Sequence, residues 1–119
     1  MNGSGKQIYC FADVEIDLLR GCLRRSGEEI YLRPKTLQVL IYLIEQRERL
    51  VTKEELMESI WKDTAVTDDA LVQCVGDIRR ALKDDPHRPQ FVKTFPKLGY
   101  HFISPEVEVR SEIRPSAAP

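Results

Sequence analysis

The chain has 119 residues, of which 42% are hydrophobic and 31% charged, and its 18 Lys and Arg against 19 Asp and Glu give a formal net charge of −1 at pH 7. This balance is typical of a single folded domain and excludes an intrinsically disordered chain. The longest apolar run, residues 37–44, is far shorter than the roughly 20 residues of a membrane span, and no signal-peptide-like stretch follows Met1, so we expect a cytoplasmic protein.

The first third of the chain predicts a small antiparallel sheet. Residues 8–12, 14–18 and 29–32 are strand-like runs rich in β-branched and aromatic residues, separated by turn residues. The last two strands are expected to form a hairpin across residues 25–28, whereas residues 19–23 are too irregular to assign. Residues 1–7 are expected to be disordered.

A first helix is predicted to begin at Pro34, because proline is favoured at the first position of a helix. Apolar residues follow it at helical spacing: Leu37, Leu40, Ile41 and Ile44, with Val39 and Leu43 widening the stripe. This helix should therefore be largely buried.

A second helix is predicted to begin after Thr52. Thr52 and Glu55 have the spacing of a capping box, and Val51 and Leu56 have the spacing of a hydrophobic staple. The helix is expected to be short, because residues 62–67 lack any apolar period. Its inward-facing residues are expected to be Leu56, Met57, Ile60 and Trp61.

A third helix is predicted over residues 68–83. Thr67 is a good N-cap residue, and Asp68 and Asp69 lie in the first turn, where the helix dipole favours negative charge. One stripe is apolar: Leu71, Val75, Ile78 and Leu82. The opposite face carries polar or small residues, with a mixed flank beside it: Asp69, Gln73, Gly76, Asp77 and Arg80, flanked by Val72, Arg79 and Lys83. The predicted core unites the stripes of the three helices: Leu37, Leu40, Ile41, Ile44, Leu56, Ile60, Leu71, Val75, Ile78 and Leu82.

A hairpin is predicted after the breaker Asp84-Asp85-Pro86. Its strand-like runs are residues 91–95 and 100–104, and the exposed tip between them is Pro96-Lys97-Leu98-Gly99. We name the hairpin of residues 91–104 the wing. Residues 105–119, with their Pro, Ser and Ala, are expected to be a linker or a disordered tail.

The sequence contains no pattern typical of an enzyme or of a cofactor site. It has no Gly-rich phosphate loop and no Ser/His/Asp arrangement, so we expect no catalysis and no small-molecule substrate. Cys10, Cys22 and Cys74 are far apart and lack a Cys-x-x-Cys pair. We therefore expect reduced structural thiols, no disulfide, no metal and no cofactor.

The charge is unevenly distributed along the chain. Residues 79–101 contain six Lys or Arg residues and two Asp residues, and the rest of the chain carries an excess of negative charge. A net charge of −1 is low for a nucleic-acid-binding protein, but this basic segment would attract phosphate.

Six short motifs, in their order along residues 8–104, resemble the OmpR/PhoB family of winged helix-turn-helix domains. They are residues 32–35 (LRPK), 51–56 (VTKEEL), Trp61, 78–82 (IRRAL), 99–102 (GYHF) and the strand, three-helix and hairpin order itself. The resemblance implies an α+β fold with an N-terminal antiparallel sheet, a three-helix core and a C-terminal wing. It further implies sequence-specific binding of double-stranded DNA by a bacterial transcription regulator, with residues 68–83 in the major groove and the wing near the minor groove.

The candidate DNA contacts come partly from this resemblance and partly from the residues. Trp61, Arg79 and Thr94 match family positions that commonly touch phosphates, and Tyr100 matches the aromatic after the wing glycine. The basic strip adds three further candidate phosphate contacts: Lys83, Lys93 and Lys97. The candidate base readers are Gln73 for adenine, Arg80 for guanine and Asp77 for cytosine.

Several of these positions have alternative interpretations. Asp77 has the i−3 spacing from Arg80 that would orient the arginine instead, and Trp61 could belong to the core. Gly76 and Asp77 stand where many family members have arginines, so the family's arginine roles do not transfer. Gly76 could let the backbone approach DNA or a protein closely, or it could be neutral.

The placement of the fold near the start of the chain resembles the CadC/ToxR arrangement. This resemblance implies a sensor or effector region beyond residue 119. A second hypothesis for the whole domain is a protein-interaction module that has lost strong DNA binding, with RNA polymerase, a sister subunit or the chain's own sensor domain as the partner.

Overall fold

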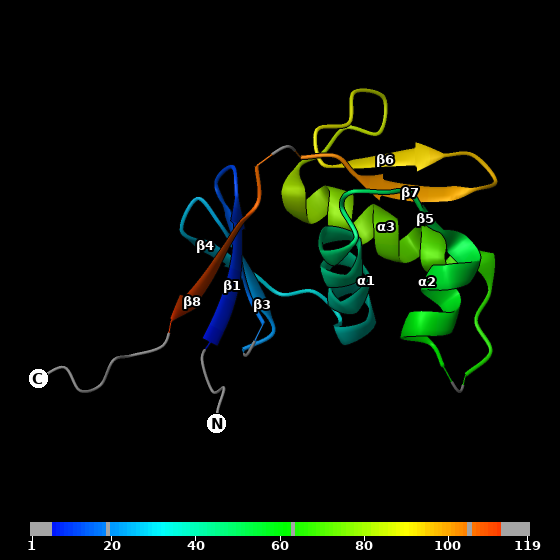
Figure 1. Ribbon diagram of the computed structural model, residues 1–119, viewed down its shortest axis with the longest axis horizontal. Coiled ribbons are helices and arrows are strands. Elements are labelled where there is room, and N and C mark those ends of the chain that lie inside the picture. The colour runs from blue at the N-terminus through cyan, green and yellow to red at the C-terminus, as the bar shows by residue number, and fades with distance from the viewer. Residues whose placement is uncertain (1–5, 19, 63, 105, 113–119) are drawn as a thin grey trace, which may run out of the picture. The chain divides into compact units, whose positions relative to one another are not determined.

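The computed structural model describes residues 6–18, 20–62, 64–104 and 106–112. The chain divides into two compact units, Met1–Tyr31 with Glu106–Pro119, and Leu32–Pro105. The first unit consists of strands, and the second contains helices and a hairpin (Figure 1). The predicted α+β class is therefore confirmed.

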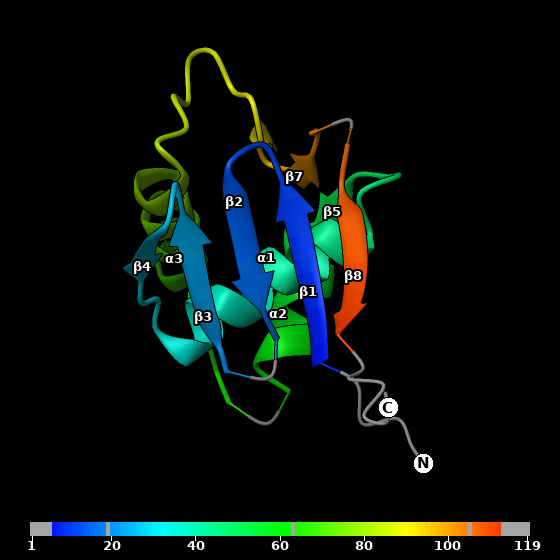
Figure 2. The same cartoon turned by 90° about the vertical axis from the view of Figure 1, so that its left-hand side faces the viewer.

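Five antiparallel strands form the sheet of the first unit, in the order β4-β3-β2-β1-β8 (Figure 2). Alternating residues of β2, Val14 and Ile16, are buried, and in β3 the first two residues, Cys22 and Leu23, are buried. The predicted N-terminal antiparallel sheet is thus confirmed. The strand bounds are β1 Lys6–Phe11, β2 Val14–Asp17, β3 Cys22–Arg25, β4 Glu28–Ile30 and β8 Glu108–Glu112.

The turn between β3 and β4 is the predicted hairpin across residues 25–28. Ser26 and Gly27 both have positive φ, 51° and 83°, as the two-residue turn that matches strand twist requires. The Ser26 Oγ donates to Asp13 Oδ2 at 2.5 Å, and this hydrogen bond lowers the pKa of Asp13. The first strand of the hairpin, β3, begins in the segment that the sequence left unassigned.

Strand β8 lies within residues 105–119, which the sequence predicted to be a linker or a disordered tail, and that prediction is wrong for Glu108–Glu112. Its residues pair with β1 from Glu112 opposite Lys6 to Glu108 opposite Cys10. Because β8 is largely charged and its partner strand lies at the other end of the chain, no local sequence pattern predicts that β8 pairs with β1. Lys6 and Gln7 likewise belong to β1 and not to a disordered N-terminus, while residues 1–5, 105 and 113–119 lie outside the described residues.

Three helices form the body of the second unit: α1 Pro34–Glu45, α2 Lys53–Ile60 and α3 Asp68–Leu82. Each begins where the sequence predicted, and α3 ends one residue earlier, because Lys83 adopts the left-handed conformation that closes a helix. Every predicted core residue of these helices is buried except Ile41, which is half-buried.

A three-stranded sheet in the order β5-β7-β6 completes this unit. Its strands are β5 Val51–Thr52, β6 Val92–Phe95 and β7 Gly99–Phe102, so the predicted wing is confirmed. Gly99 pairs with Thr52, and a Cβ at Gly99 would lie 2.0 Å from the Val51 carbonyl oxygen. Any other residue at this position would therefore force β5 and β7 apart.

Candidate nucleic-acid interface

Helices α2 and α3 follow one another along the chain, in the order of a helix-turn-helix. Thr52 Oγ1 accepts a hydrogen bond from the Glu55 N–H at 3.1 Å, which confirms the threonine half of the capping box. Thr67 Oγ1 accepts from the Ala70 N–H at 3.2 Å at the start of α3. The side chains that cap both helices are thus the ones predicted from the sequence.

One side of α3 is exposed to solvent and carries most of the candidate contacts. The opposite side packs into the core through Leu71, Val75 and Ile78. The exposed residues of α3 and its C-cap include Asp69, Val72, Gln73, Arg80 and Lys83. Among the candidate base readers, Gln73 and Arg80 are therefore accessible, whereas Asp77 is half-buried.

Asp77 joins two arginines. Its Oδ2 accepts from Arg33 at 2.7 Å, and its Oδ1 pairs with Arg80 three residues later in the helix. The hydrogen bond from Arg33 is the main reason why the pKa of Asp77 is lowered, with charge attraction from both arginines adding to it. Asp77 is thus a charged carboxylate that pairs with both arginines. The i−3 spacing predicted the pair with Arg80 as one of two interpretations, whereas Arg33 is a partner that the sequence did not reveal.

Arg79 connects α3 to the wing. Its guanidinium donates to the Val92 carbonyl at 3.1 Å and to Thr94 Oγ1 at 2.6 Å. Arg79 and Thr94, both predicted phosphate contacts, are therefore brought into direct contact with each other. This pair fixes the position of β6 relative to α3.

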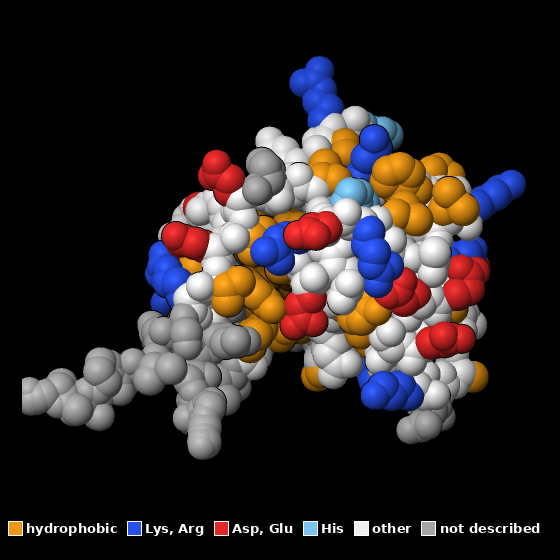
Figure 3. Space-filling view, in the orientation of Figure 1, with side chains coloured by type: hydrophobic (Ala, Val, Ile, Leu, Met, Phe, Trp, Pro, Cys, Tyr) orange, Lys and Arg blue, Asp and Glu red, His pale blue; other side chains and the backbone are white. Residues whose placement is uncertain are grey.

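The wing carries two exposed lysines, Lys93 and Lys97. The Lys93 Nζ lies 5.2 Å from the centre of the Phe95 ring, and Lys97 has a φ of 67° in the turn. Leu98 beside it is 56% exposed, whereas Tyr100 is buried. Over the β6–β7 hairpin, Figure 3 shows hydrophobic side chains flanked by basic ones.

The wing is also hydrogen-bonded to the start of α2. The Lys53 N–H donates to the Leu98 carbonyl at 3.0 Å, next to the pairing of Thr52 with Gly99. The tip of the wing and the first helix of the helix-turn-helix are consequently held in one fixed geometry.

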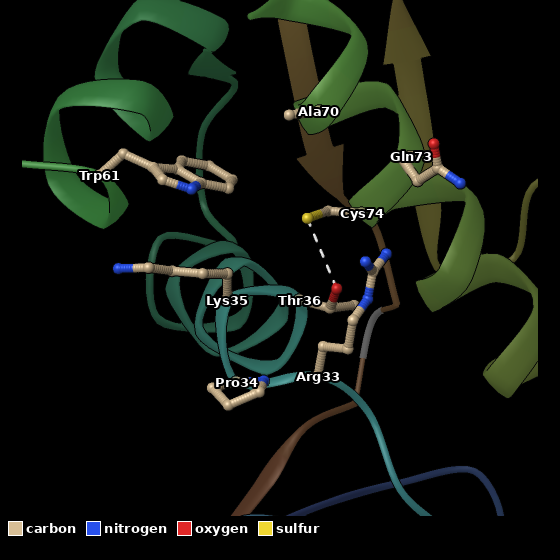
Figure 4. Close-up of a pocket in the computed structure, with 8 residues that line it drawn as sticks. All are labelled: Arg33, Pro34, Lys35, Thr36, Trp61, Ala70, Gln73 and Cys74. Carbon is tan, nitrogen blue, oxygen red and sulfur yellow. Dashed lines mark hydrogen bonds between the residues drawn. The ribbon is translucent and has the colours of Figure 1, made fainter. Parts of the chain in front are cut away.

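Trp61 ends α2 and is half-buried. It borders an open cavity of about 500 Å³ between the three helices. Figure 4 shows Trp61 on one side of this cavity and Gln73 on the other, with Thr36 and Cys74 hydrogen-bonded between them. The Trp61 ring is therefore neither fully in the core nor fully free, which fits both interpretations that the sequence left open.

Asp84 is a residue whose role the sequence analysis missed. It is buried, and its carboxylate accepts from the N–H groups of Gln90, Phe91 and Val92 at 2.7, 3.2 and 2.9 Å. It thereby fixes the chain that leads from α3 into the wing. The only sequence signal was its place in the breaker Asp84-Asp85-Pro86, which marks a turn but not its hydrogen-bond partners.

Within the described residues, no group of three or more His, Cys, Asp or Glu side chains is placed to hold a metal ion. Cys10, Cys22 and Cys74 are buried, and burial raises the pKa of the Cys10 thiol. Their expected inertness toward metals stays a prediction. In the same part of the chain, no helix is long and apolar enough to cross a membrane.

Comparison with known sequences links the chain to transcription regulators. Residues 27–102 match the family described as "Transcriptional regulatory protein, C terminal". The chain is 28% identical over 86 residues to the transcriptional activator CadC of Escherichia coli K12, a match that covers 71% of this chain and 17% of CadC. The chain thus spans about a sixth of the length of that relative.

Solved structures share the fold. The DNA-binding domain of E. coli CadC has a TM-score of 0.75 and 23% identity, covering 88% of this chain and 98% of that one. The response regulator DrrB, an OmpR/PhoB homologue from Thermotoga maritima, has a TM-score of 0.72 and 33% identity, covering 81% and 44%. The Klebsiella pneumoniae RstA DNA-binding domain, solved in complex with the RstA box, has a TM-score of 0.71 and 19% identity, covering 82% and 97%.

Proposed function

Because the chain belongs to the transcriptional regulatory protein family with the OmpR/PhoB-type winged helix, a family of regulators and not of enzymes, we propose that it binds double-stranded DNA sequence-specifically. In this proposal α3 enters the major groove and the wing lies near the minor groove. The domain acts in the cytoplasm, as part of a longer regulator with a sensor or effector region.

The observation that carries the proposal is the joint presentation of α3 and the wing. The exposed side of α3 bears Gln73 and Arg80, and Arg79 ties the same helix to β6 through Val92 and Thr94. A reading helix and a second DNA-contacting element are thereby preorganised, so little conformational entropy is lost on binding.

Phosphates are bound by basic and hydroxyl side chains around this surface. Thr94 Oγ1 accepts from Arg79 and keeps its own O–H to donate to a phosphate oxygen. The indole N–H of Trp61 can reach a phosphate from the rim of the cavity. The proposed backbone contacts are Trp61, Arg79, Lys83, Lys93, Thr94 and Lys97.

Bases are read from α3. Gln73 has the amide geometry for bidentate contact with adenine, and Arg80 the guanidinium geometry for guanine. Asp77 acts by orienting Arg80, since both of its oxygens are engaged with arginines. Alternatively, Asp77 accepts a hydrogen bond directly from cytosine N4, and for this it must release one of the two arginines.

The experiment is selection of a duplex from a randomised pool, followed by affinity measurements over a range of salt concentrations. The random segment should be long enough for two half-sites, because a single domain with few cations binds weakly. Each neutralised phosphate contributes about −0.9 to the slope of log K against log salt. Lys97→Ala should flatten this slope by about one, whereas the control Arg24→Ala, on the five-stranded sheet, should not.

A protein-interaction module is the second candidate function. It draws on the net charge of −1 and on two exposed apolar residues, Val72 and Leu98. In that case the partner is RNA polymerase or a sister subunit. No duplex should then bind in a salt-dependent way, and Lys97→Ala should not change binding to any duplex.

A further inference from the structure

Gly76 lies at the centre of the exposed side of α3 and contributes no side chain there. At 100° per residue its Cα lies on the opposite side of the helix from Cys74 and Ile78, both of which are buried in the core. A Cβ at Gly76 would meet no atom within 4 Å other than those of its chain neighbours and of the backbone of its own helix. Packing within the described residues therefore does not require glycine here.

Glycine at this position lowers the stability of the helix. In a helix interior glycine is less favourable than alanine, because its backbone loses more conformational entropy. A destabilising residue without a packing reason, at the centre of the face proposed to enter the major groove, points to a partner that approaches the backbone of α3 closely.

An exposed apolar side chain lies one helical turn before Gly76. Val72 is 58% exposed, and it borders a small hollow of about 130 Å³ that also reaches Lys97 and Leu98 of the wing. The neighbouring Gln73 is exposed and polar. Val72 and Gly76, one turn apart, together form a small apolar patch on a helix face that is otherwise polar.

We propose, on the basis of the DNA-binding function proposed above, that Gly76 lets the backbone of α3 approach the base edges and that Val72 packs against a thymine methyl group. The thymine C5-methyl is the apolar group that the major groove offers, and valine is complementary to it. Gln73 projects about 100° around the helix from Val72, so the two side chains read different base pairs. The site read by α3 therefore contains A·T pairs at both positions.

The test uses the 119-residue chain and the duplex that it selects from the random pool. Gly76→Ala should raise the melting temperature by about 4 °C, because alanine favours the helix. The same variant should weaken binding by about tenfold or more, because the new methyl separates α3 from the bases. A merely structural role of Gly76 cannot explain a variant whose melting temperature rises while its affinity for DNA falls.

The thymine contact is tested by replacing each thymine of the selected duplex in turn by deoxyuridine, which removes only the methyl group. One replacement should weaken binding of the unaltered chain by about fourfold, the effect of one buried methyl. Val72→Ala should abolish this sensitivity, and the matched apolar variant Leu98→Ala should retain it.

Two outcomes overturn the inference while leaving DNA binding intact. One is a Gly76→Ala variant that binds the selected duplex as well as the unaltered chain does. The other is a deoxyuridine series without a position whose effect depends on Val72. If the random pool yields no duplex with salt-dependent binding, the proposed function itself fails, and that result is distinguishable from the first two.

Discussion

Replacing Asp77 with asparagine tests how the electrostatics of α3 control DNA recognition. The carboxylate accepts from Arg33 at 2.7 Å and also pairs with Arg80. Arg33 lowers the pKa of Asp77, so the carboxylate is charged at pH 7 and offsets part of the positive charge of both arginines. Asparagine keeps the size of the side chain and removes this charge.

The expected effect on stability is small. The side chains of Arg33 and Arg80 are 65% and 73% exposed, so solvent screens both ion pairs. Their combined loss should lower the free energy of unfolding by about 1 kcal/mol. The variant therefore remains folded, and its DNA binding can be interpreted.

The expected effects on DNA binding have opposite signs. Without the carboxylate one arginine becomes available to a phosphate, so affinity for any sequence rises and the salt slope steepens by about 0.9. Arg80 also loses the partner that orients it, so discrimination at the base that it reads should fall by about tenfold, within the 1–3 kcal/mol of a good base contact.

Fluorescence anisotropy with the selected duplex and a scrambled one, at several salt concentrations, measures both effects. The control is Asp69→Asn, which removes the same charge from the first turn of α3, far along the helix from Arg80. It should raise affinity for both duplexes equally. If Asp77→Asn also leaves the ratio of the two affinities unchanged, Asp77 merely repels DNA and does not orient Arg80.

Three further variants test separate parts of the molecule. Lys97→Ala should weaken binding to all duplexes alike in salt titrations, because a phosphate contact carries no sequence information. Gln73→Ala should cost roughly 1–3 kcal/mol on the selected duplex and relax selection at one base pair. Glu55→Gln should lower the free energy of unfolding at pH 7 by about 1 kcal/mol, because hydrogen bonds from Arg49 and Tyr42 lower the Glu55 pKa from 4.5 to about 2. A lowered pKa stabilises the fold above pH 4.5, so this difference should vanish as pH falls toward 2.

Each of these variants has an outcome that contradicts its premise. Lys97→Ala that reduces binding to the selected duplex alone would make Lys97 a base contact. Gln73→Ala with unchanged selection at every position would remove glutamine from the reading set. A Glu55→Gln difference that persists at pH 2 would mean that the carboxylate contributes through packing and not through its charge.

Local chemistry in the sequence accounts for the helices. Pro34, Thr52 and Thr67 each stand at a helix start, and one apolar stripe per helix predicts the buried residues. Strand β8 could not be predicted in this way, because its hydrogen bonds depend on β1 at the other end of the chain. Pairing over such a distance leaves no trace in local residue preferences.

The candidate interface was predictable to a similar extent. The spacing of Asp77 and Arg80 indicated that they could form an ion pair, because residues three apart on a helix are neighbours. The contacts of Asp77 with Arg33 and of Arg79 with Thr94 join different elements, so they follow only from tertiary structure. The sequence named Asp77, Arg79, Arg80 and Thr94 as candidates, but it did not show which residues they contact in other elements.

The close approach of Gly99 to Val51 limits how this domain can acquire new targets. Because there is no room for a Cβ at Gly99, substitutions there separate β5 from β7 and disturb the start of α2. The exposed side chains of Gln73 and Lys83 on α3 and at its C-cap have no such restriction, since they contact solvent and not the core. Changes in target sequence can thus accumulate on α3 one residue at a time, while the rigid contact between the wing and the start of α2 has to be kept.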